Sequence, residues 1–369
     1  MERKNAWAAY AGDDGRVEAF AKAYCDFINN GKTERECVAY GEKLAKAHGF
    51  EDLNAVVRSG RKLEAGARVY ANWMGKSFML FVLGEKPLEE GMNILGAHID
   101  SPRIDVKQNP LYEDTDLAYL DTHYYGGIKK YQWVAIPLAL HGVIVRKTGE
   151  KVIINIGEDE NDPVFCISDL LVHLAQEQMT KNAKEVVEGE ALNLIVGGRP
   201  LEGEEKDAVK ANVLKLLADK YGVEEEDFLS AELEIVPAGK ARDMGFDRSM
   251  ILAYGHDDRV CAYPSMMAVL DYEGTPEYTL CCIVTDKEEI GSVGATGMAS
   301  HYLENTVAEL YACTADYCEL AVRRCLRNSR MLSSDVSAGY DPNFASAFEK
   351  KNSAFLGRGI CFNKFTGSR

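Results

Sequence analysis

The chain has 369 residues, enough for two domains, because single hydrophobic cores stop growing at roughly 250–300 residues. Its 46% hydrophobic and 27% charged residues are typical of a soluble globular protein. The net charge of −16 argues against nucleic acid or an anionic membrane as a partner, because both bind basic surfaces.

Cysteine usage and apolar runs bear on the compartment. The ten cysteines include no Cys-x-x-Cys pair, and several, such as Cys281 and Cys282, lie in apolar runs. We therefore expect reduced thiols in a cytoplasmic protein. No apolar run is long enough to cross a bilayer, and the first residues lack the apolar core of a signal peptide, so we expect no membrane partner.

The first part of the chain alternates helical and strand patterns. Apolar residues recur at helical spacing from Asp14 to Gly49, which predicts two amphipathic helices with a break at Asn29-Asn30-Gly31. Strand-like runs follow at Ala67–Asn72 and Ser77–Leu83, and then a buried-strand pattern at Ile94–Ala97.

His98 and Asp100 close this last strand and share one face of an extended chain. His98 could bind a metal ion while Asp100 holds the other imidazole nitrogen. A histidine satisfied in the core or paired at the surface explains the same two residues equally simply.

Residues 109–244 differ in character. They contain β-rich stretches, such as Val134–Val145 and Val152–Ile156, and a helical pattern at Lys206–Tyr221, separated by charged runs. We interpret them as an inserted domain with a lid or assembly role. The predicted division is 1–108 and 245–369 for the catalytic domain and 109–244 for the insertion.

Carboxylates cluster at turns in the last part of the chain. Gly255–Val260 opens a helix that continues through Leu270, and Asp257 or Asp258 could simply cap it. The strand-like run Tyr278–Val284 leads into Glu288 and Glu289 and then a glycine-spaced turn. In such a loop one acid could bind a metal ion and the other move protons, although a solvated acidic turn is an alternative.

Two further helices are predicted, at Met298–Leu303 and Ala312–Leu326. Asp335 follows the second of them in a turn-rich stretch, where a short acidic side chain ordinarily caps a turn. Each acidic position is ambiguous alone. Together, His98, Asp258, Glu288, Glu289 and Asp335 supply the oxygen ligands, the imidazole and the spare base that a two-metal hydrolytic site needs.

Four motifs carry a family resemblance: Gly96–Arg103, Gly255–Val260, Asp286–Ser292 and Ser334–Asn343. In this order, and over nearly the whole chain, they resemble the aspartyl aminopeptidase/aminopeptidase I family of two-zinc metallopeptidases. The resemblance implies an α/β fold: a three-layer catalytic domain with a mixed central sheet flanked by helices, interrupted by an inserted β-rich dimerisation domain. It also implies a homo-oligomer built from dimers that admits only short peptides.

The resemblance implies a role for each motif residue. His98 and Asp335 would bind one metal ion, Asp258 would bridge the two ions, and Glu289 would bind the second. Glu288 would be the catalytic base and Asp100 would orient His98. The ions would be two divalent cations, with zinc expected first and manganese or cobalt as alternatives.

The chain departs from the family pattern in two places. The loop after the fourth motif carries Ala338 and Asp341 where aspartyl aminopeptidases usually carry histidines. If Tyr340 and Asp341 line the substrate pocket, the negative charge leaves a preference for acidic or neutral N-terminal residues open. The family also supplies a final histidine ligand, and no histidine follows Asp335 here. We therefore expect that the C-terminal end of the catalytic domain is missing from this chain.

Three functions are compatible with these patterns. A metal-dependent aminopeptidase is the first. A related two-metal amide hydrolase of the deacylase type would use the same ligands, and recognition of a free α-amine separates the two. A catalytically silent assembly subunit is the third, and the spare acid Glu288 beside Glu289 argues against it.

Overall fold

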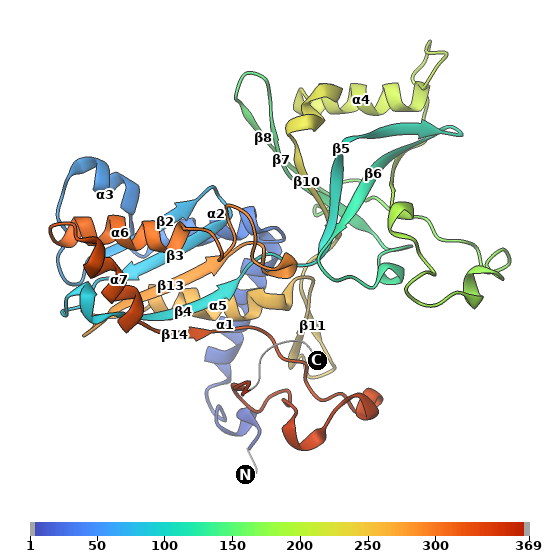
Figure 1. Ribbon diagram of the computed structural model, residues 1–369. Coiled ribbons are helices and arrows are strands. Elements are labelled where there is room, and N and C mark those ends of the chain that lie inside the picture. The colour runs from blue at the N-terminus through green and yellow to red at the C-terminus, as the bar shows by residue number, and fades with distance from the viewer. Residues whose placement is uncertain (1–3, 365–369) are drawn as a thin grey trace.

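The computed structural model describes residues 4–364 and contains two main β-sheets, each with its own core (Figure 1). The first sheet is mixed, with strand order β1-β2-β3-β13-β4-β14. Its strands are β1 (Glu51–Asp52), β2 (Arg68–Trp73), β3 (Ser77–Val82), β4 (Met92–His98), β13 (Thr279–Thr285) and β14 (Arg330–Ser333). Strands β4, β13 and β14 run parallel, so their carboxyl ends lie at one edge.

Helices cover both faces of this sheet, which confirms the predicted three-layer α/β architecture (Figure 1). One face packs against α3 (Leu53–Ser59), α6 (Tyr302–Thr314) and α7 (Glu319–Asn328). The other packs against α1 (Asp14–Asn30), α2 (Glu34–Ala47) and α5 (His256–Leu270).

Strand β3 shows how the sequence builds two cores from one strand. Met79 and Phe81 join the first core, whereas Phe78 and Leu80 join the second. Successive side chains of a strand point to opposite faces, so a continuous apolar run fits a sheet that is covered on both sides.

The second sheet belongs to the inserted part and is antiparallel throughout, in the order β8-β7-β10-β5-β6-β9. Its strands are β5 (Arg103–Asp114), β6 (Leu117–Tyr125), β7 (Leu138–Val145), β8 (Lys151–Ile156), β9 (Leu194–Gly197) and β10 (Glu232–Pro237), and α4 (Ala208–Tyr221) packs on its core. The chain enters through β5 and leaves through β10, which are neighbours: Ile104 pairs with Ile235. A hairpin of β11 (Arg242–Met244) and β12 (Met250–Leu252) leads back to α5.

Two of the predicted helices differ from the structure. The helix expected at Met298–Leu303 begins only at Tyr302, because Gly291 and Gly294, each with a φ of 90°, keep the preceding segment in turns. The helix expected at Ala312–Leu326 is interrupted, since Ala315 and Cys318 are extended and separate α6 from α7. The two N-terminal helices and the helix opening at His256 are confirmed.

Within residues 4–364, no helix combines the length and apolar character that a membrane span requires. The ten cysteines are all free thiols.

Candidate metal centre

Four loops meet at the edge where β4, β13 and β14 end. They carry His98 at the end of β4, Asp257 and Asp258 at the start of α5, Glu288 and Glu289 after β13, and Asp335 after β14. The register of the parallel strands brings these loops together, because Thr285 of β13 lies opposite His98 and Ser333 of β14 lies opposite Gly96.

His98 is buried and is held from one side by Asp100. Its Nδ1 lies 3.0 Å from the Asp100 backbone carbonyl and 3.3 Å from the Asp100 carboxylate. Its Nε2 points into the cluster, 3.2 Å from Asp257 Oδ1, yet makes no hydrogen bond of good geometry. A buried nitrogen with this environment is matched to a cation, since buried polar atoms are otherwise hydrogen-bonded.

Asp257 and Asp258 face different ways at the first turn of α5. The Asp258 side chain is fully buried, and its Oδ2 accepts a hydrogen bond from the His98 backbone N–H at 3.4 Å. The Asp257 side chain is half exposed and faces His98 Nε2. Gly255, at a φ of 83°, turns the chain into this position, and any side chain there would collide with Arg259 Nη1.

Glu288 and Glu289 form a short 3-10 helix, η7 (Glu288–Ile290), whose backbone is tied to Asp100. The Glu288 N–H donates to Asp100 Oδ1 and the Glu289 N–H to Asp100 Oδ2, both at 3.2 Å. Glu288 Oε2 lies 3.7 Å from His98 Nε2. Asp335 Oδ1 lies 4.0 Å from the same nitrogen, so the structure brings all four predicted loops together.

The cluster concentrates negative charge in a partly buried place. Burial raises the pKa of Asp258 to about 6, and burial together with the charge of Asp257 raises the pKa of Glu289 to about 7. Burial also raises the pKa of Glu288. Burial lowers the pKa of His98, but the neighbouring carboxylates of Asp100 and Asp257 outweigh it and raise that pKa to about 11. Every one of these pKa values is raised, so each group binds a proton more readily than usual. An environment that favours added protons in this way also favours a bound metal cation.

Two overlapping sets of donors could hold a cation. His98, Asp258 and Asp335 form one, and His98, Asp257 and Glu289 form the other, with the donor atoms of each set within 4.8 Å of one another. The mixture of one imidazole with carboxylates suits zinc, manganese or cobalt. Asp257 was given no ligand role from the sequence, because the family resemblance assigned the ligand role at this turn to Asp258.

Tyr340 and Asp341 occupy a separate segment after β14. Asp341 caps the 3-10 helix η8 (Pro342–Ala347), accepting from the Asn343 N–H at 2.8 Å. The Tyr340 ring packs against Phe348 and Phe355, with centroids 5.7 and 5.5 Å away. Their part in substrate binding stays a prediction.

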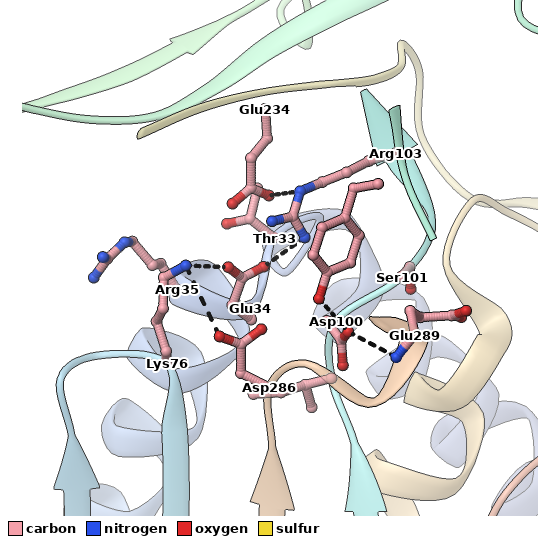
Figure 2. A network of polar contacts seen from close by, with 12 residues as sticks. Thr33, Glu34, Arg35, Lys76, Asp100, Ser101, Arg103, Glu234, Asp286 and Glu289 are labelled. Atoms are coloured by element: carbon pink, nitrogen blue, oxygen red, sulfur yellow. Dashed lines mark hydrogen bonds and ion pairs between the residues drawn. The ribbon is translucent and has the colours of Figure 1, made fainter. Parts of the chain in front are cut away.

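A buried network of ion pairs lies next to the centre and joins the two sheets (Figure 2). Glu34 of α2 accepts from Lys76 Nζ at 2.7 Å and from Arg103 Nη1 at 3.2 Å. Lys76 also approaches Asp286, just before η7, at 3.9 Å, and Arg103 pairs with Glu234 of β10 at 3.3 Å. The negative charge of Glu34 therefore compensates two buried cations, one from each part of the chain.

Replacing Glu34 by glutamine should destabilise the protein by about 3–5 kcal/mol, because it leaves Lys76 and Arg103 with one fewer buried counter-charge. Urea denaturation followed by circular dichroism measures the loss. Glu319→Gln is the matched control, since the Glu319–Arg323 pair is exposed on α7 and should contribute at most about 0.5 kcal/mol. Equal midpoints for the two variants would contradict the assignment of Glu34.

Comparison with known proteins identifies the class first. The family model described as aminopeptidase I zinc metalloprotease (M18) matches residues 27–369. The chain therefore matches a family of zinc metallopeptidases.

Similar proteins and solved structures identify the group within this class. A probable M18 family aminopeptidase 1 from Clostridium acetobutylicum is 57% identical over 372 residues, covering 100% of this chain and 79% of the relative. The crystal structure of aminopeptidase I from that organism matches with a TM-score of 0.90 and 54% identity, over 100% of this chain and 80% of the other. The Saccharomyces cerevisiae mApe1 dodecamer, at 21% identity, shares the fold with a TM-score of 0.71, over 92% and 76% of the two chains. The chain belongs to the M18 aminopeptidase I family and is a metalloaminopeptidase, a hydrolase acting on peptide bonds.

Proposed function

We propose that this aminopeptidase removes acidic or neutral N-terminal residues from short peptides, with two divalent ions, most favourably zinc, in the centre described above. The observation that carries the proposal is the unsatisfied buried Nε2 of His98, around which carboxylates from three other loops converge. Such ions polarise a scissile carbonyl and lower the pKa of water, which makes amide hydrolysis feasible at neutral pH.

His98 Nε2 belongs to both donor sets but can bind only one ion. We therefore infer that a carboxylate is shared between the two ions. The family resemblance implied this shared role for Asp258. We favour Asp257, because it lies beside His98 Nε2 on the open side and belongs to the donor set with Glu289. Asp258, whose Oδ2 already faces the His98 backbone N–H, would support the ion held by His98 and Asp335 from the buried side.

Glu288 is the carboxylate left over for proton transfer. It belongs to neither donor set, its side chain is half exposed, and its Oε2 lies 3.7 Å from His98 Nε2. We assign it the removal of a proton from the attacking water and the return of that proton to the leaving amine. Burial raises its pKa, which makes it a better proton acceptor than an ordinary glutamate.

Hydrolysis of leucine and aspartate p-nitroanilides by the zinc-loaded protein tests the proposal. We expect turnover that disappears on chelation and also when the substrate amine is acetylated. Equal or faster cleavage of the N-acetylated compounds would favour a deacylase-type amide hydrolase. Metal binding without turnover of either substrate would favour a silent assembly subunit.

We propose further that the chain forms a homo-oligomer built from dimers in the cytoplasm. Large apolar side chains stand exposed on the inserted domain between residues 164 and 179, namely Val164, Leu170, Leu171, Val172, Leu174 and Met179. Exposed apolar patches of this kind mark association surfaces, and the yeast relative is a dodecamer. The ten free thiols fit a reducing compartment.

A further inference from the structure

Asp100 receives a hydrogen bond that comes from the inserted domain. The hydroxyl of Tyr125, the last residue of β6, donates to Asp100 Oδ2 at 2.6 Å. The same oxygen accepts from the Glu289 N–H, and the other oxygen accepts from the Glu288 N–H. Asp100 is fully buried and Tyr125 is 6% exposed, so water does not replace this donor readily.

The Tyr125 ring is itself held in place. The Arg103 guanidinium lies 4.0 Å from the ring centroid, and the Lys287 ammonium lies 5.4 Å from it. Arg103 in turn pairs with Asp105 at 2.8 Å and with Glu34 and Glu234 of the buried network. The hydroxyl is therefore presented to Asp100 by a packed and charge-paired ring, and holding it there loses little side-chain entropy.

The residue after Tyr125 lies close to Glu289, the second glutamate of η7. Gly126 has a φ of 73°, and a Cβ at this position would lie 3.2 Å from the Glu289 Cβ and 3.4 Å from Pro102. The end of β6 thus leaves little room for a side chain beside Glu289 and contacts Asp100 through the tyrosine hydroxyl. Tyr125 and Gly126 both belong to the chain of the inserted domain, so this domain borders the centre here.

We propose that Tyr125 is a positioning residue through which the inserted domain fixes the metal centre. By holding the Asp100 carboxylate in one orientation, it sets both the His98 ring and the backbone of Glu288 and Glu289. The inference rests on the ligand and base roles proposed for these residues. Partners that orient metal ligands typically contribute 10–100-fold to metal affinity or activity.

Tyr125→Phe in the full chain removes the hydroxyl and keeps the ring, and Tyr124→Phe, on the same strand and 41% exposed, is its matched control. For Tyr125→Phe we expect zinc affinity, measured against a chromogenic chelator, to fall on the order of 10-fold. We expect kcat to fall with little change in KM, since the lost contact touches no substrate. A changed visible spectrum of the cobalt-substituted protein would report altered ligand geometry directly.

Hydrogen exchange of the amides of Glu288 and Glu289 provides a readout that needs neither metal nor activity. These amides should exchange faster in Tyr125→Phe than in the parent, before and after zinc is added, and should not change in Tyr124→Phe. Unchanged exchange, affinity and kcat in Tyr125→Phe, or equal effects in both variants, would overturn the inference. A parent that binds no zinc while the exchange difference persists would instead refute the proposed function and leave the positioning contact supported.

Discussion

Replacing Glu288 by glutamine should slow peptide hydrolysis on the order of 10²–10⁴-fold while metal binding stays nearly intact. Glutamine keeps the size of the side chain but cannot accept a proton from water at neutral pH. Glu288 belongs to neither donor set, so its replacement leaves the ligands in place. The measurement is kcat on an aminoacyl anilide at equal zinc occupancy, with occupancy determined on the same samples.

The control for this experiment is Glu309→Gln, a glutamate on α6 away from the centre. It should turn over like the parent. Activity of Glu288→Gln within a few-fold of the parent would show that another group moves the proton. A large loss of zinc together with activity would make Glu288 a ligand.

If the centre holds two zinc ions as proposed, Asp257→Asn should weaken the binding of both, whereas Asp258→Asn should weaken only the binding at His98 and Asp335. The reason is that Asp257 faces His98 Nε2 and shares a donor set with Glu289, so a neutral amide there weakens the carboxylate that we propose both ions share. Removing a direct ligand should cost more than the 10–100-fold that loss of an outer partner costs. Calorimetric titration of the metal-free variants with zinc separates the sites by affinity.

Asp258→Asn is the matched comparison, because it makes the same chemical change one residue away. Circular dichroism must first show that each variant is folded, since Asp258 is fully buried. Two sites of parental affinity in Asp257→Asn, with both weakened in Asp258→Asn, would return the shared role to Asp258, as the sequence predicted.

The sequence sufficed for the parts of the site that short motifs encode. His98 with Asp100 and the pair Glu288 and Glu289 each follow an apolar strand that the sequence predicts, and parallel strands bring such residues to one edge. Asp335 was expected after a helix, and the short strand β14 that precedes it was not predicted. The choice between Asp257 and Asp258 could not be made, because their side chains leave the start of α5 in different directions that no local pattern specifies.

Side-chain contacts between residues far apart in the chain could also not be predicted from the sequence. Glu34 lies in the segment predicted to be helical and belongs to no motif, and only the tertiary fold pairs it with Lys76 and Arg103. Tyr125 carries no motif signal either. Helix α6 begins later in the chain than the apolar pattern predicted, because the positive φ of Gly291 and Gly294 keeps the preceding residues in turns.

The placement of β5 beside β10 has a consequence for the catalytic sheet. In that sheet Ile94 pairs with Cys281, from opposite sides of the insertion. Once folded, the insertion holds Ile104 opposite Ile235, so its length no longer counts as loose chain between the paired strands. The entropic cost of closing a loop grows only with the logarithm of its length. Holding the two ends of the insertion together therefore lowers this cost by only about 1 kcal/mol. A whole domain can thus interrupt the sheet between its central strands while adding almost nothing to the entropic cost of their pairing.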